Sequence, residues 1–362
     1  MTIPNAVGAR RYHVTPLPFM PFSNTGGEAL SDSGAVAGGI ANSDGSVSLA
    51  IWAGGVLTDL GAPPGIPSRD FNRPRVFGMN SAGAIVGTVH TPAGDLPSRW
   101  FIHDRGCFTV LPLADPTDLG GGAIGINIHG EVVGYHHTAR NAQTGWRWYE
   151  GRYSRLPVAG VNTVALGINS SGVIIGNRSL SLARRLMTGR IFDKGERGYV
   201  LDQGTARFLS GFVYAINDQG EAAGGWRIQG TSKATVFRDG RSLVIVGSPS
   251  YAVGINSATE VVGFYQPAGH EYRRLFIWSD DCGPLDLTPA GYRRAEAAAI
   301  NSRGDVLGFG ETLSGRSEYF LLTPAADGAL TPKALISTPP APGPAASDRH
   351  ERPLARGSRP GC

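Results

Sequence analysis

Seven related segments divide this chain into a regular array, and this repetition limits its fold more than any other feature. The clearest segment is LGINSSGVIIGN, Leu166 to Asn177, and five others share its Asn and its apolar run. A seventh, weaker copy runs from Glu28 to Gly38. The equivalent positions are Ser31, Asn80, Asn127, Asn169, Asn217, Asn256 and Asn301. Their spacings of 49, 47, 42, 48, 39 and 45 residues indicate a repeat array.

Each segment is typical of a β-hairpin. In Asn169-Ser170-Ser171-Gly172 the Asn side chain can bond to nearby backbone, and the Gly takes a left-handed conformation, so the four residues predict a tight turn. The apolar residues 173–175 predict a strand buried on both faces that ends at Gly176.

Two more strands are expected in each repeat. The third is often aromatic, as in SRWFIH ending at His103, and GRIFD (residues 189–193) takes this place in the fourth repeat. A short turn such as Asp239-Gly240 then precedes a fourth strand, as in CFTVLP. Because the Asn recurs at the turn of six repeats, we interpret these Asn residues as structural turn residues.

Four strands in each repeat predict the blades of a β-propeller, and seven repeats predict seven blades. The last repeat has only three strands, ending with Glu318 to Thr323, whereas residues 11–18 form a strand without a hairpin partner. We expect this N-terminal strand to complete the last blade, which leaves no open sheet edge. The predicted fold is an all-β, seven-bladed β-propeller of four-stranded blades over residues 1–323. Residues 324–362, rich in Pro, Ala and Gly, predict a disordered tail.

Composition and charge exclude several classes of protein. The formal net charge is +4, and without the tail there are 28 basic and 26 acidic residues, so no surface for nucleic acid is expected.

Cys107, Cys282 and Cys362 are far apart, which predicts unpaired thiols. The first residues do not read as a signal peptide and no run is long enough to span a membrane, so we expect a soluble, cytoplasmic protein. We also expect it to be a monomer.

The segments GINIHGEVVGYH and AIWAGGVLTDLG, the latter running from Ala50 to Gly61, carry a family resemblance. The pattern INxxGxVVG, followed by a strand ending in Trp and then GxxTDLG, resembles the HAF repeats of bacteria over residues 11–323. That resemblance implies a β-propeller and an extracellular location, the alternative to the cytoplasm. A second resemblance is to the regulator-of-chromosome-condensation propellers, whose Gly-x-Asn-x-x-Gly is shared but whose Gln-Leu-Gly is replaced here by VIIG or EVVG.

A functional site is expected at the mouth of the central channel, on the face opposite the Asn turns, because loops of several blades converge there. The position five residues before each Asn begins the first strand on that face. It differs between repeats, being Arg75, Gly122, Val164, Phe212, Tyr251 and Glu296, with Gly26 in the first copy. This variety indicates either a functional rim or ordinary variation of solvated loops.

The connections between second and third strands reach the same face. They carry His90, His136, His137, Arg140, Trp226, Tyr265, His270 and Glu311. Histidines from several blades can supply general acid–base catalysis, so we assign catalysis to His136, His137 and Glu296. The residues assigned to ligand binding are Arg75, His90, Trp226, Tyr251, Tyr265 and His270. The alternative is that His136 and His137 only decorate a surface loop.

No spacing of the HxxxH, HxH or CxxC kind is present, so neither a metal nor a cofactor is expected. The nucleophile elbow of hydrolases, the phosphate loop and the dinucleotide fingerprint are also absent. The expected function is a binding or scaffold protein whose partner is a small molecule, a glycan or a protein at the channel mouth. The alternative is an enzyme, a lyase, isomerase or cyclase acting on a small molecule or sugar at the same mouth.

Overall fold

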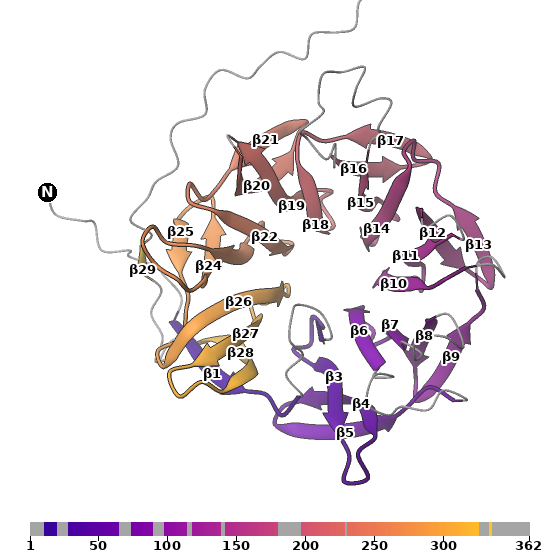
Figure 1. The fold of residues 1–362 in the computed structure, drawn as a ribbon, viewed down its shortest axis with the longest axis horizontal. Coiled ribbons are helices and arrows are strands. Elements are labelled where there is room, and N and C mark those ends of the chain that lie inside the picture. Colours follow the sequence, from indigo (N-terminus) through magenta and orange to yellow (C-terminus); the bar gives the residue numbers. More distant parts are fainter. Residues whose placement is uncertain are drawn as a thin grey trace, which may run out of the picture.

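Seven antiparallel sheets surround a central channel in the computed structural model (Figure 1). It describes residues 11–19, 28–64, 74–89, 98–113, 118–138, 142–179, 197–228, 230–325 and 333–334. No residue in these ranges is helical, and consequently none of them belongs to a helix that could cross a membrane. The seven-bladed, all-β propeller expected from the sequence is confirmed.

Each blade places its first strand nearest the channel and its last strand at the periphery (Figure 1). Blade 1 consists of β2 (Ala29–Leu30), β3 (Val36–Ala41), β4 (Val47–Ala53) and β5 (Val56–Gly61). Blade 2 consists of β6 (Pro74–Met79), β7 (Ile85–Val89), β8 (Arg99–Asp104) and β9 (Cys107–Leu111). Blade 3 consists of β10 (Gly121–Ile126), β11 (Val132–His137), β12 (Gln143–Tyr149) and β13 (Arg152–Arg155). Blade 4 consists of β14 (Asn162–Ile168), β15 (Ile174–Ser179), β16 (Arg197–Asp202) and β17 (Thr205–Phe208).

The remaining blades follow the same order. Blade 5 consists of β18 (Phe212–Ile216), β19 (Ala222–Ile228), β20 (Thr231–Arg238) and β21 (Arg241–Val244). Blade 6 consists of β22 (Ser250–Ile255), β23 (Val261–Tyr265), β24 (Arg274–Ser279) and β25 (Gly283–Asp286). Blade 7 consists of β26 (Tyr292–Ile300), β27 (Val306–Thr312), β28 (Ser317–Ala325) and β1 (Arg11–Pro16). The face that carries the Asn turns is called the Asn face below, and the face where the first strands begin is called the loop face.

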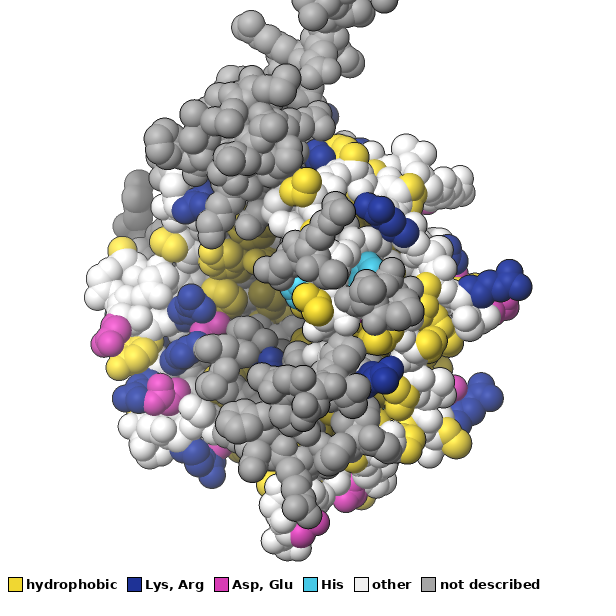
Figure 2. Space-filling model, turned by 45° about the vertical axis from the view of Figure 1, so that its right-hand side comes forward, with side chains coloured by type: hydrophobic (Ala, Val, Ile, Leu, Met, Phe, Trp, Pro, Cys, Tyr) yellow, Lys and Arg dark blue, Asp and Glu magenta, His cyan; other side chains and the backbone are white. Residues whose placement is uncertain are grey.

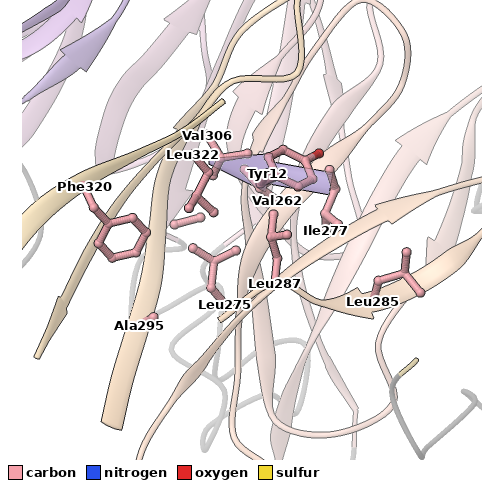
Figure 3. Packing of buried hydrophobic residues seen from close by; sticks show 11 residues of the cluster. Tyr12, Val262, Leu275, Ile277, Leu285, Leu287, Ala295, Val306, Phe320 and Leu322 are labelled. Carbon is pink, nitrogen blue, oxygen red and sulfur yellow. The ribbon is translucent and has the colours of Figure 1, made fainter. Parts of the chain in front are cut away.

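The N-terminal strand closes the ring as expected. β1 pairs with β28 from Arg11 opposite Ala325 to Pro16 opposite Phe320. Tyr12 is 1% exposed and belongs, with Phe320 and Leu322, to the core between blades 6 and 7 (Figure 3). Closure therefore rests on both backbone pairing and buried apolar contact.

Three details differ from the sequence analysis. The third strand of blade 4 is β16, at Arg197–Asp202, and not residues 189–193, which lie outside the described part of the chain. β28 extends to Ala325, two residues beyond the expected boundary. Lys333–Ala334 forms β29, which pairs with the outer edge of β25, so this part of the expected tail has regular backbone structure.

Gly176 does not end its strand, because β15 continues to Ser179. A Cβ atom at Gly176 would lie 1.9 Å from the carbonyl oxygen of Val164 and 2.5 Å from the hydroxyl of Tyr199. The aromatic ring of the third strand thus packs where a side chain would otherwise stand. This close approach, rather than a chain reversal, explains the glycine.

The Asn side chain builds the turn between first and second strands. In blade 4, Oδ1 of Asn169 accepts the N–H groups of Ser171 (3.1 Å) and Val173 (2.9 Å), and Gly172 has a φ of 79°. The bond to the fourth residue recurs at Asn80, Asn127, Asn217, Asn256 and Asn301. The sequence interpretation of these residues is confirmed.

The same side chains also join neighbouring blades, which the sequence analysis did not predict. The Nδ2 group of one Asn donates to the backbone carbonyl of the next at 2.9 to 3.2 Å. These bonds run from Asn80 to Asn127, Asn127 to Asn169, Asn169 to Asn217, Asn217 to Asn256, Asn256 to Asn301, and Asn301 to Ser31. Ser31 has no carboxamide, so it cannot make the corresponding bond from blade 1 to blade 2.

Removing residues 1–18 should destabilise the protein strongly, because it exposes the edge of β28 and removes the buried Tyr12. Loss of a large buried aromatic costs about 3 kcal/mol or more, so we expect the melting temperature to fall by at least about 5 °C. Thermal unfolding followed by circular dichroism measures this. Removing residues 345–362, the same number, is the matched control and should leave the melting temperature unchanged.

Replacing Ser31 by Asn should supply the seventh bond of the ring. A buried hydrogen bond contributes about 1 kcal/mol net, so the melting temperature should rise by about 2 °C. The reverse exchange, Asn169→Ser, should lower it by at least as much, since it removes an existing bond to Asn217. A Ser31→Asn variant that melts at or below the wild-type temperature would contradict the role given to this ring.

Candidate binding site at the channel mouth

A β-bulge recurs on the first strand of six blades, three residues before the Asn. In blade 5, for example, the register shifts between Val213 and Ala215, which leaves Tyr214 unpaired in the bulge. The bulge residues are Phe77, Ile124, Leu166, Tyr214, Val253 and Ala298. All are at least partly exposed although the strands around them are packed, so they line the channel. Figure 2 shows hydrophobic side chains on the walls of the central hollow.

Blades 5 and 6 bring four aromatic rings together, three on their first strands and one on β23. Tyr251 on β22 lies 5.8 Å from Phe212 and 6.5 Å from Tyr214, both on β18, and 5.3 Å from Phe264 on β23, measured between ring centroids. Tyr214 is 41% exposed, and the other three rings are half-buried. We call Phe212, Tyr214, Tyr251 and Phe264 the aromatic cluster.

An arginine and a buried carboxylate extend the aromatic cluster toward blade 7. The guanidinium of Arg273 lies 4.7 Å from the ring centroid of Phe264, a cation–π contact. Its Nη1 atom is 3.2 Å from Oε2 of Glu296, and Nε of Arg294 donates to Oε1 of Glu296 at 2.7 Å. Glu296 is only 3% exposed, so it holds Arg273 in place over the ring. Of the residues expected from the sequence, Tyr251 and Glu296 are thus brought into one network.

Arg75 lies on β6, beside a buried carboxyl group that the sequence analysis did not single out. Glu28 immediately precedes β2 and is 8% exposed. Burial raises the pKa of the Glu28 carboxyl from 4.5 to about 8, although a hydrogen bond to Tyr319 and the charge of Arg75 both act to lower it. Glu28 is therefore a protonated acid at neutral pH.

His136 and His137 point to opposite sides of β11, because successive side chains of a strand alternate. Nδ1 of His136 lies 2.6 Å from Oδ1 of Asp118, which is 1% exposed, but the approach lacks the direction of a hydrogen bond. The His137 ring meets Tyr135 edge-on, with centroids 5.5 Å apart. The structure therefore does not unite these two histidines in one site, nor does it place either in the aromatic cluster.

The other expected residues have separate surroundings. Trp226 is half-buried on β19, opposite Lys233. Tyr265 is buried between blades 5 and 6, where burial and the nearby charge of Asp286 raise the pKa of its hydroxyl. His270 is exposed after β23. Glu311 pairs with Arg293, and His90 and Arg140 lie outside the described residues.

Some residues of the site were missed, and two had a visible signal. Glu28 and Tyr214 occupy the same position of the repeat, three residues before Ser31 and Asn217. The other repeats have Phe77, Ile124, Leu166, Val253 and Ala298 there, so a carboxylate stands out. Phe264, Arg273 and Asp118 carry no comparable signal, because only the folded blades bring them to their partners.

No family model and no curated protein matches this chain. Its fold is similar to solved β-propellers. The β-propeller domain of the Trilobed protease from Pyrococcus furiosus is 11% identical, with a TM-score of 0.56 over 90% of this chain and 96% of that one. That domain is described as having an open velcro topology, whereas here the β1–β28 pairing closes the ring.

Two further structures are similar at comparable levels. An acylaminoacyl peptidase from Pyrococcus horikoshii is 12% identical, with a TM-score of 0.52 over 83% of this chain, which spans 51% of that peptidase. A chain of the Mitotic Checkpoint Complex is 10% identical, with a TM-score of 0.51 over 90% of this chain and 98% of that one. At such identities the likeness shows the fold alone.

Replacing Glu28 by Gln should change the pH dependence of stability. The folded protein holds the Glu28 proton up to about pH 8, whereas the unfolded chain releases it near 4.5, so rising pH across this window favours unfolding. Gln keeps the shape of the neutral acid without titrating. We expect the variant to match the wild type near pH 4.5 and to become more stable than it by a few kcal/mol toward pH 8. Urea unfolding at several pH values in this window measures the difference. The same dependence of the unfolding free energy on pH in both proteins would contradict the prediction.

Proposed function

We propose that this chain is a binding protein whose site is the aromatic cluster at the channel mouth, and that it recognises a ligand with a flat ring, such as a sugar of a glycan. The observation that carries this is the contact of four partly exposed rings on blades 5 and 6. Blades 3 and 4 have Gly122 and Val164 at the position of Phe212 and Tyr251. The rings are therefore not needed to form a blade.

The chemistry of the site suits such a ligand. Aromatic faces stack on the apolar faces of sugars and of other rings. Arg273, held beside Phe264 by Glu296, presents charged N–H donors that can meet hydroxyl groups at the edge of a stacked sugar. A few directional polar groups next to an apolar surface are the usual composition of a small-ligand site.

A binding role fits the geometry better than catalysis. Glu296, the proposed catalytic carboxylate, has both oxygens engaged by arginines. The contact of His136 with Asp118 is the observation that favours an enzyme, because a buried carboxylate beside an imidazole can orient a general base.

A glycan array screened with the whole protein, followed by titration of the best ligand, tests the proposal. We expect Tyr214→Ala and Tyr251→Ala each to weaken binding at least about fivefold, since stacking on one ring is worth about 1 kcal/mol or more. Tyr149→Ala is the matched control, because Tyr149 is similarly exposed, at 37%, but ends β12. It should bind as the wild type does.

Two results would overturn the proposal. One is binding that survives both changes in the aromatic cluster. The other is turnover of a bound ligand that is lost in His136→Gln and kept in Tyr251→Ala, which would move the function to the enzyme alternative at blade 3.

A further inference from the structure

A cavity lies in the contact between blades 3 and 4, and none of the aromatic cluster lines it. It encloses about 420 Å³ and opens where the Asn turn of blade 4 meets the turn between β16 and β17. Arg147 and Arg155 line it from blade 3, and Ser170, Ser171 and Asp202 line it from blade 4. Its volume falls within the range of small-molecule sites.

At this cavity, blade 3 has a charged residue at a third-strand position that is apolar in the other six blades. In every blade the sixth residue after the Asn or Ser pairs with a third-strand residue that faces the next blade. These third-strand residues are Ile51, Ile102, Arg147, Val200, Val236, Ile277 and Leu321. The six aliphatic ones contribute to the packing between blades. Arg147 replaces that contact with a charge.

Blade 3 compensates for this charge internally. Arg147 forms an ion pair with Glu131, which is 8% exposed. Glu131 also accepts a hydrogen bond from Nδ2 of Asn127 at 2.9 Å. An ion pair placed in a packed interface usually contributes less stability than apolar residues of similar size. The other six blades have aliphatic residues at this position. Blade 3 therefore loses apolar packing against blade 4, and a polar cavity lies there instead.

The charges left over on the cavity walls indicate what it holds. Within the described part of the chain, neither Arg155 nor Asp202 has an ion-pair partner within 4.0 Å. The first is on the wall from blade 3 and the second on the wall from blade 4. The hydroxyls of Ser170 and Ser171 add neutral hydrogen-bonding groups.

We propose that this cavity binds a small zwitterion, a free amino acid or a short peptide, with its carboxylate at Arg155 and its ammonium group at Asp202. One exposed, unpaired cation on the wall from blade 3 and one exposed, unpaired anion on the wall from blade 4 complement a ligand that carries both charges. A ligand with a single charge would leave the other wall unmatched. This site is separate from the aromatic cluster and does not rest on its proposed function.

Titration of the whole protein with glycylglycine tests the proposal, with amide shifts of residues 170–172 and 203–204 recorded by NMR. N-acetylglycine and glycinamide, which keep only one of the two charges, should bind at least about fivefold more weakly. Glycine and triglycine in the same series separate a free amino acid from a peptide. Absence of shifts at about 10 mM glycylglycine, or equal binding of the singly charged probes, would overturn the proposal.

Variants assign the charges. Arg155→Gln and Asp202→Asn should each weaken glycylglycine binding at least about fivefold. Arg152→Gln, on the same strand but outside the cavity, should not change it. Unchanged affinity in Arg155→Gln would also overturn the proposal.

A double change tests the origin of the cavity. Glu131→Val with Arg147→Val copies the residues that blade 4 has at these positions, Val173 and Val200. We expect this variant to melt at or above the wild-type temperature and to lose binding. Retained binding would contradict the role given to Arg147. The single surface changes decide the assignment even where the double variant does not fold.

Discussion

The hydrogen bond from one Asn side chain to the backbone of the next blade is the interaction on which the rest of this propeller depends. The Oδ1 atom of each Asn fixes the turn within its own blade, and its Nδ2 group fixes the position of the next blade. One residue thus sets both the local hairpin and the assembly of hairpins. Since every member of the ring is buried, each bond is made away from competing water.

The ring also explains the composition of the first strands. Seven strands converge on one axis, and they come closest near the Asn residues. A Cβ atom at Gly125 would lie 3.2 Å from the Cα atom of Gly167 on the neighbouring blade, so there is little room for larger side chains there. In six blades a bulge directly before this position turns one residue toward the channel. Between the bulge and the loop face, the side chains differ in size from blade to blade. The aromatic cluster lies in this part of blades 5 and 6.

The architecture could be predicted because every repeat has the same sequence pattern of turn and strands. The closure of the ring could also be predicted, since the last repeat lacked a strand that the N-terminus supplied. The third strand of blade 4 was expected at residues 189–193, but it is β16, because both segments place an aromatic residue beside an aliphatic one. Only the pairing with β15 distinguishes the two segments.

The candidate site was less accessible from the sequence. Tyr251 and Glu296 stood out as exceptions at one repeat position, but their connection runs through Phe264 and Arg273, which come from other strands. The assignment of His136 and His137 to one site overlooked the alternation of side chains along a strand. These two residues are neighbours in the sequence, but their side chains lie on opposite sides of β11.

In a repeat protein, each blade can be compared with the other six. The residues that six blades share at a position show what packing alone would favour in the remaining blade. By this standard Glu28, the aromatic cluster and Arg147 are all departures, and each is unfavourable for folding by itself: a neutralised carboxyl group, exposed rings and a charge between blades. In a closed array each blade contacts only its neighbours, so one such departure weakens one contact and leaves the others intact. The ring of Asn residues makes that tolerance possible, because it holds the blades at the axis whatever occupies the loop face or the groove between two blades. Function can therefore be added to this fold at several separate places.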